Sequence, residues 1–153
     1  MSRSGYHDDL DVLDLGRWRG QVASAIRGKR GQVFFRELVA ALDAMPEKRL
    51  IQGALEEEAG VCAIGALCRA KGIHMETIDP SEPSEVAPLF DIAECLAREV
   101  VYMNDEFFDT RLTEDRKGYR DYTPEELWQA MRDWAAKKIR AAVNGSELPK
   151  VTK

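Results

Sequence analysis

The sequence lacks any apolar run near the roughly 18 residues that a membrane-spanning helix needs. It also lacks the basic-then-apolar start of a secretory signal, because aspartates occupy positions 8, 9, 11 and 14. Both absences argue against export or a membrane partner. We therefore expect the protein to stay in the cytosol in which it is made.

Cysteine and histidine are scarce, with three and two residues. An odd number of cysteines without an export signal predicts reduced thiols rather than a disulfide framework. Cys62 and Cys68 are six positions apart, which on a helix separates them by about 600°. Zinc ligands instead come from tight turns, about two to four residues apart. We expect buried apolar cysteines, no metal and no cofactor.

Catalysis by a cysteine is the enzyme alternative. Cys62 falls at the expected start of a helix, where the helix dipole can lower the pKa of a thiol. His74 or His7 would then serve as its base. Val61 and Ile64 beside the cysteine indicate burial instead. We therefore predict no catalytic residue and a protein that is not an enzyme.

Charge is unevenly distributed along a chain of net charge −5. Residues 17–36 contain six bases and no acid, and residues 76–109 contain ten acids against the single base Arg98. Asn104, Asp105, Glu106 and Asp109 resemble a magnesium ligand set, but without a phosphate-binding loop we interpret them as a solvated acidic loop. Such an acidic surface would bind a basic protein or imitate the charge of a nucleic acid.

The basic segment favours a different class of function. Gly28-Lys29-Arg30-Gly31 is predicted to form a turn between two helices. A Gly-x-x-Gly turn with a basic middle resembles the loop by which KH domains clamp a nucleic-acid backbone. Helix-turn-helix DNA binding fits the same residues, and so does a plain connection in a helical hairpin. The candidate nucleic-acid contacts are Arg17, Arg19, Arg27, Lys29, Arg30 and Arg36.

Apolar periodicity predicts an α+β, mostly α-helical fold, with about five helices and a small β-hairpin or two to three short strands. We expect a single globular domain over residues 1–145 and a flexible C-terminal tail over 146–153. Helices are predicted over 15–27, 32–44, 62–72, 91–104 and 123–143, with a helical turn over 84–89. Short strands are predicted over 10–15 and 49–57, and loops over 74–84 and 105–122.

Capping residues fix the start of two of these helices. Thr123, Pro124 and Glu126 predict a capping box with proline at the first helical position. Asp91 and Glu94 predict a second capping pair. The helix over 62–72 contains small residues that allow neighbouring backbones to approach closely. We therefore expect this helix at the centre of the packing.

The stretch from Gly60 to Leu67 resembles a Cys-x-Leu-Gly-x-Leu signature of small uncharacterised proteins of bacteriophages and prophages. Those proteins also carry an Asn-Asp pair after a helix, similar to Asn104-Asp105, and a final amphipathic helix, similar to residues 123–143. One departure is the eighteen residues over 105–122, where the family passes quickly to its last helix. The resemblance implies a phage accessory protein in the host bacterial cytoplasm and no catalytic residues.

Size, acidity and this setting are similar to those of anti-CRISPR inhibitors. Our hypothesis is a non-enzymatic inhibitor of a bacterial defence complex (CRISPR-Cas) that acts by protein-protein binding through an acidic and aromatic surface. Aromatic residues are favoured as interface hot spots. The sequence leaves self-association as a homodimer open. The predicted partner-binding residues are Asp105, Glu106, Phe107, Phe108, Asp109, Tyr119 and Tyr122.

Overall fold

The computed structural model describes Ser4 and residues 12–58, 60–79 and 82–140. Its fold is mostly α-helical with two small antiparallel hairpins, which confirms the predicted fold class. The larger helices are α1 (Val12–Arg27), α2 (Lys29–Ala44), α3 (Ala63–Lys71), α5 (Glu94–Tyr102) and α6 (Pro124–Lys138). The shorter elements are η1 (Met75–Thr77), α4 (Pro83–Val86), η2 (Ala87–Phe90), the π-helix η3 (Met103–Phe107), and the strands β1 (Glu56–Glu57), β2 (Gly60–Val61), β3 (Thr110–Leu112) and β4 (Tyr119–Asp121).

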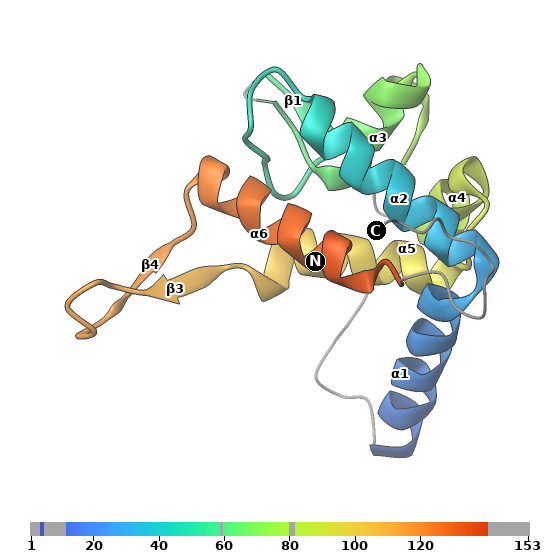
Figure 1. Cartoon of the computed structure of the whole chain (residues 1–153), viewed down its shortest axis with the longest axis horizontal. Coiled ribbons are helices and arrows are strands. Elements are labelled where there is room, and N and C mark those ends of the chain that lie inside the picture. Colours follow the sequence, from blue (N-terminus) through green and yellow to red (C-terminus); the bar gives the residue numbers. More distant parts are fainter. Residues whose placement is uncertain (1–3, 5–11, 59, 80–81, 141–153) are drawn as a thin grey trace, which may run out of the picture.

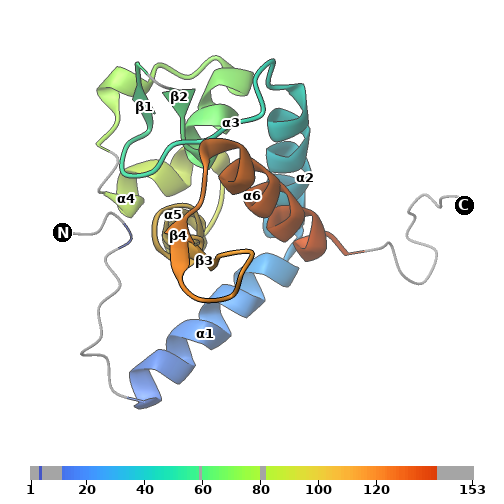
Figure 2. The same ribbon diagram turned by 90° about the vertical axis from the view of Figure 1, so that its left-hand side faces the viewer.

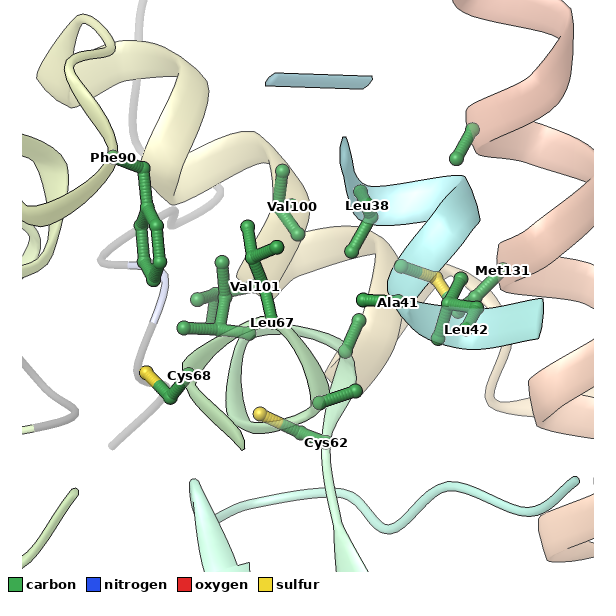
Figure 3. Close-up of a cluster of buried hydrophobic side chains, with 14 of the residues drawn as sticks. Leu38, Ala41, Leu42, Cys62, Leu67, Cys68, Phe90, Val100, Val101 and Met131 are labelled. Carbon is green, nitrogen blue, oxygen red and sulfur yellow. The ribbon is translucent and has the colours of Figure 1, made fainter. Parts of the chain in front are cut away.

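Helix α3 lies at the centre of the packing, as predicted. Its residues from Ala63 to Cys68 are all buried. Figure 3 shows Leu67 of α3 converging with Leu38 of α2 and Val101 of α5. Helix α2 packs between α3 and α6, and α1 packs on α2 and α5. Helices α2, α3, α5 and α6 form most of the core, and α4 and η2 add Val86, Ala87 and Phe90 to it. The N-terminal half of α1 extends away from it (Figures 1 and 2).

Several predicted boundaries were wrong near the N-terminus. Val12, Leu13 and Leu15 belong to helix α1 instead of a strand, because Val12 and Leu15 continue the apolar stripe of Val22 along one helix face. Leu10 and the start of the chain lie outside the described residues. The predicted strand over 49–57 is reduced to the two residues of β1, which pair with β2.

The predicted four-residue turn Gly28–Gly31 was also wrong. Only Gly28 interrupts the helices, and Lys29, Arg30 and Gly31 form the first turn of α2. A Cβ on Gly31 would lie 2.0 Å from the carbonyl oxygen of Ala25. Gly31 is therefore required by the close approach of α1 and α2. Helix packing thus explains the second glycine of the Gly-x-x-Gly pattern.

Helix α5 starts without its predicted capping pair. Ala93 precedes the helix and no side chain caps it, while Asp91 adopts a left-handed conformation with φ of 54° that ends η2. The predicted loop over 105–122 was wrong as well, because it contains the end of η3 and the β3–β4 hairpin. The hairpin projects from the body (Figure 1).

Helix α6 confirms the predicted capping box. The Thr123 hydroxyl accepts the Glu126 backbone N–H at 3.1 Å, and the Glu126 carboxylate accepts the Thr123 N–H at 3.0 Å. The helix ends at Lys138, earlier than predicted, because Ile139 is extended. Residues 141–153, including the expected helix end and the tail, lie outside the described residues.

The buried amide of Gln32 explains this early end. Its Nε2 donates to the carbonyl oxygens of Ile26 (2.8 Å) and Lys138 (2.9 Å), and its Oε1 accepts the Arg140 N–H at 2.7 Å. One side chain of α2 therefore terminates both α1 and α6, whose last carbonyls have no partner within their own helix.

We expect Gln32→Ala to lower the free energy of unfolding by about 2 kcal/mol, because buried backbone groups lose their partners. Urea unfolding followed by circular dichroism measures the change. Val33→Ala, at the neighbouring exposed position, is the matched control and should stay within about 0.5 kcal/mol of the parent protein. Equal losses in both variants would contradict the capping role.

Candidate partner-binding site

A groove of about 970 Å³ lies between α1 and α6, with α5 and η3 contributing further lining. We call it the aromatic groove. Figure 2 shows α1 and α6 diverging around α5. Its lining residues are Leu15, Trp18, Arg19, Glu99, Tyr102, Met103, Glu106, Phe107, Phe108, Ala130, Asp133, Trp134, Lys137 and Lys138.

The π-helical turn η3 places the aromatic residues at the edge of this groove. Phe107, at its end, is 57% exposed, whereas Phe108 is half-buried against the core. The rings of Phe107 and Phe108 meet edge-to-face with centroids 5.1 Å apart. Phe108 also contacts Tyr122, at 5.7 Å, and Phe107 contacts Tyr102, at 6.3 Å. A continuous set of rings therefore runs from α5 to the base of the hairpin.

Asn104 fixes this turn to the centre of the fold. It is buried, its Oδ1 accepts the Ala63 N–H at 3.1 Å, and its Nδ2 donates to the Ile51 carbonyl oxygen at 2.8 Å. Asp105 accepts the Gly53 N–H at 3.1 Å and the Asn104 Nδ2 at 2.9 Å. The Asn-Asp pair therefore holds the start of α3 and the segment before β1 beside η3.

The cysteine and glycine of the signature belong to the same junction. Cys62 is the N-cap of α3, and its Sγ accepts the Gly65 N–H at 3.4 Å. A Cβ on Gly65 would lie 2.2 Å from the Leu55 carbonyl oxygen. Both motifs of the resemblance thus meet at the N-terminus of α3, where they support packing.

Thiol chemistry finds little support in this geometry. Cys62 is buried and His74 is exposed. Burial, with a smaller effect of nearby Cys62, raises the pKa of the Cys68 thiol to about 11, and burial also raises the pKa of Cys95. Among the described residues no three His, Cys, Asp or Glu side chains are grouped to hold a metal ion.

The predicted acidic and aromatic residues are only partly brought together. Glu106, Phe107 and Phe108 line the aromatic groove, and Tyr122 touches Phe108. Glu106 accepts the Ser4 hydroxyl at 2.6 Å, so this carboxylate already has a partner. Tyr119 is 73% exposed on the hairpin, beyond the lining of the groove. Asp109, also exposed, precedes β3.

Sequence reasoning missed the walls of the groove. Trp18 on α1, Tyr102 on α5 and Trp134 on α6 supply aromatic surface that was not predicted as part of the site. Trp18 stacks under the Arg98 guanidinium at 5.4 Å, and Trp134 lies under the Lys138 ammonium at 5.9 Å. The only indication of these walls in the sequence was the presence of two tryptophans in predicted helices.

Some bases of residues 17–36 form ion pairs with acids of residues 76–109, so part of the uneven charge is neutralised within the fold. Arg19 binds the buried Glu99 with two hydrogen bonds, at 2.8 and 3.0 Å. Arg30 pairs with Asp91 at 3.1 Å. Arg17 pairs with Asp14, and Arg98 with Glu94. Of the remaining predicted nucleic-acid contacts, Arg27, Lys29 and Arg36 are exposed and form no ion pair within the described part of the chain.

Comparison with protein-family models, with curated proteins and with solved structures found no match. The candidate site is therefore defined by geometry and chemistry alone. None of the described helices is both long and apolar enough to cross a membrane.

At the base of the hairpin, Glu126 links three elements. Arg120 donates to it twice, at 2.7 Å, and Arg111 donates at 3.1 Å. Hydrogen bonds from Arg120 lower the pKa of the Glu126 carboxyl from 4.5 to about 2. A lowered folded-state pKa means that the ionised group stabilises the fold above pH 4.5 and loses this effect as the pH falls toward 2.

We accordingly expect Glu126→Gln to flatten the acid limb of the stability profile. Between about pH 5 and pH 2 the melting temperature of the parent protein should fall more than that of the variant, which lacks the titrating group. Thermal unfolding at a series of pH values measures both profiles. Parallel profiles would show that the Arg120–Glu126 pair does not contribute to acid sensitivity.

Proposed function

We propose that this protein is a non-enzymatic inhibitor of a bacterial defence complex, of the anti-CRISPR type, that binds a partner protein at the aromatic groove. The observation that carries the proposal is the exposure of Phe107 at the rim of a large hollow lined by other aromatic side chains. Exposed apolar patches on soluble proteins mark interaction sites. Aromatic side chains supply much of the binding energy at protein interfaces.

The form of the groove also favours a macromolecular partner. Its lining comes from four separate elements, α1, α5, η3 and α6, and its volume of about 970 Å³ is at the upper end of small-molecule sites. The proposed defence setting rests on the resemblance of residues 60–67 and 104–105 to phage proteins. The acidic part of the surface has weaker support, because Asp105 and Glu106 already accept hydrogen bonds from Gly53 and Ser4.

The test is capture of a host protein by the immobilised full chain from a lysate of CRISPR-positive bacteria, followed by an interference assay. Phe107→Ala should weaken capture and inhibition about tenfold or more, as expected for an aromatic hot spot. Val33→Ala, an exposed apolar change on α2 outside the groove, is the matched control. Capture of no defence component, or inhibition unchanged in Phe107→Ala, would overturn the proposal.

Two further variants separate the parts of the predicted surface. Tyr119→Ala tests whether the hairpin contributes to partner binding. Asp109→Lys tests whether the exposed carboxylate contributes to it. If Asp109→Lys alone abolishes binding and Phe107→Ala does not, charge mimicry is the better mechanism.

A second candidate is nucleic-acid binding by the basic segment, supported by the exposed cations Arg27, Lys29 and Arg36. Phosphate contacts make affinity fall steeply with salt. A gel-shift titration across salt concentrations tests it, and absence of a shift at low salt rejects it.

A further inference from the structure

The N-terminal half of α1 exposes apolar side chains that the rest of the described chain leaves uncovered. Val12 is 85% exposed, Leu13 72% and Leu15 47%, whereas Val22 in the second half is fully buried. Both ribbon views show this half of α1 projecting from the body (Figures 1 and 2). A few helical turns without tertiary packing are marginally stable in water, so a covering partner would stabilise them.

The exposed residues continue the stripe that packs in the second half. Val12, Leu15, Val22 and Ile26 follow each other at spacings of three, seven and four, which keeps them on one face of a helix. Leu15 already lines the aromatic groove, and α1 forms one of its walls. The uncovered end of the stripe therefore leads directly into the aromatic groove.

The charges of the groove and of α1 are complementary. Lys137 and Lys138 lie on the α6 wall, and Asp14 lies in the first turn of α1, half-exposed and paired at 3.3 Å with Arg17, which is itself exposed. In the sequence, Asp8, Asp9 and Asp11 precede that turn.

The other charged lining residues already have partners within the chain. Glu99 binds Arg19, and Glu106 accepts the Ser4 hydroxyl. Asp133 accepts the Gln129 amide at 2.9 Å. The two lysines are thus the lining charges best placed to receive an acidic, apolar helix.

We propose that two copies of this chain associate about a two-fold axis, with Val12 and Leu15 of each copy inserted into the aromatic groove of the other and Asp14 facing Lys137 and Lys138. Because α1 is itself a wall of the groove, a helix lying there also contacts α1 of the receiving copy. The contact is therefore reciprocal, as an isologous dimer requires.

The backbone of the inserted element also fits this groove. Apart from Phe108, every lining residue comes from a helix, and none belongs to β3 or β4. An inserted strand would find no strand edge there to satisfy its N–H and C=O groups, whereas a helix satisfies its own. The dimer would cover Phe107, and it would therefore compete with the partner protein proposed above.

Sedimentation velocity over a wide concentration range tests the association. The parent protein should shift from a 17.2 kDa monomer toward twice that mass as concentration rises. Leu15→Glu should weaken dimerisation by about tenfold or more, because it places a charge in the groove. Lys117→Glu on the hairpin, remote from the groove, is the control and should change nothing.

A charge exchange gives the sharper test. Asp14→Lys alone and the pair Lys137→Glu with Lys138→Glu should each weaken the dimer, and the three changes together in one chain should restore it. Thermal melts establish that each variant is folded. A parent protein that is monomeric at every concentration, or a dimer insensitive to all of these charge changes, would overturn the proposal. Both results concern self-association and leave the groove of the monomer available to a defence protein, so the two proposals fail separately.

Discussion

Gly65→Ala is expected to lower the free energy of unfolding by about 3 kcal/mol, among the largest effects of a single added methyl group in this protein. The new Cβ would lie 2.2 Å from the Leu55 carbonyl oxygen and 2.9 Å from the Val61 side chain. The Leu55 carbonyl cannot simply turn away, because it accepts the Cys62 N–H at 3.1 Å. Helix α3 or the backbone that carries Leu55 must therefore shift.

Gly20→Ala is the matched control, because Gly20 also lies within a helix but a Cβ there would meet nothing within 4 Å. Alanine at that position should stabilise the protein by about 0.5–1 kcal/mol through its higher helix propensity. Urea unfolding of the three proteins compares the two changes directly. A Gly65→Ala variant that unfolds at the same urea concentration as the parent would show that the close approach is not required.

The opposite expectations for these two glycines illustrate how far local sequence reasoning reaches. The capping box at Thr123 was predicted correctly, because its determinants lie within a few positions of each other. The early end of α6 was not predicted, because its cause, Gln32, is 106 positions away from Lys138. Likewise, Gly31 was predicted to be a turn residue, because nothing nearby in the sequence indicates its contact with α1.

The candidate site also contains residues that were predicted from the sequence and residues that were missed. Phe107, Phe108 and Tyr122 were predicted as one surface because they fall in one segment rich in aromatic residues, and the structure does bring these rings together. Trp18 and Trp134 were missed, because their membership depends on the angle at which α1 and α6 diverge. That angle is set by tertiary packing and leaves no local pattern in the sequence.

The signature motifs show that the sequence does not reveal how distant motif residues come together. Cys62, Gly65, Asn104 and Asp105 were used to find a resemblance, and burial of Cys62 and close packing at the small residues of its helix were expected, but nothing in the sequence indicated that the four residues meet at one place. In the fold they form one junction, where a thiol cap, a close approach and a buried amide meet at the start of α3. Packing alone accounts for these four residues, none of which lines the groove proposed for partner binding.

Removing the buried amide of that junction is the second large effect that we expect. Asn104→Ala should lower the free energy of unfolding by about 3 kcal/mol, because it leaves the Ala63 N–H and the Ile51 carbonyl without partners in a buried setting. It also removes one of the hydrogen bonds that Asp105 accepts, another being from the Gly53 N–H. Hydrogen exchange of the α3 amides should accelerate in parallel with the loss measured by urea unfolding.

Asn104→Asp distinguishes a lost hydrogen bond from a lost side-chain volume. The aspartate has nearly the same shape and still accepts from Ala63, but when ionised it cannot donate to Ile51, and its charge faces Asp105. Burial and that neighbouring carboxylate should raise the folded-state pKa of the new carboxyl. The variant should therefore be destabilised at neutral pH and recover relative to the parent as the pH falls toward about 5, since the protonated acid can donate again. A deficit that is independent of pH would instead assign the role of Asn104 to packing.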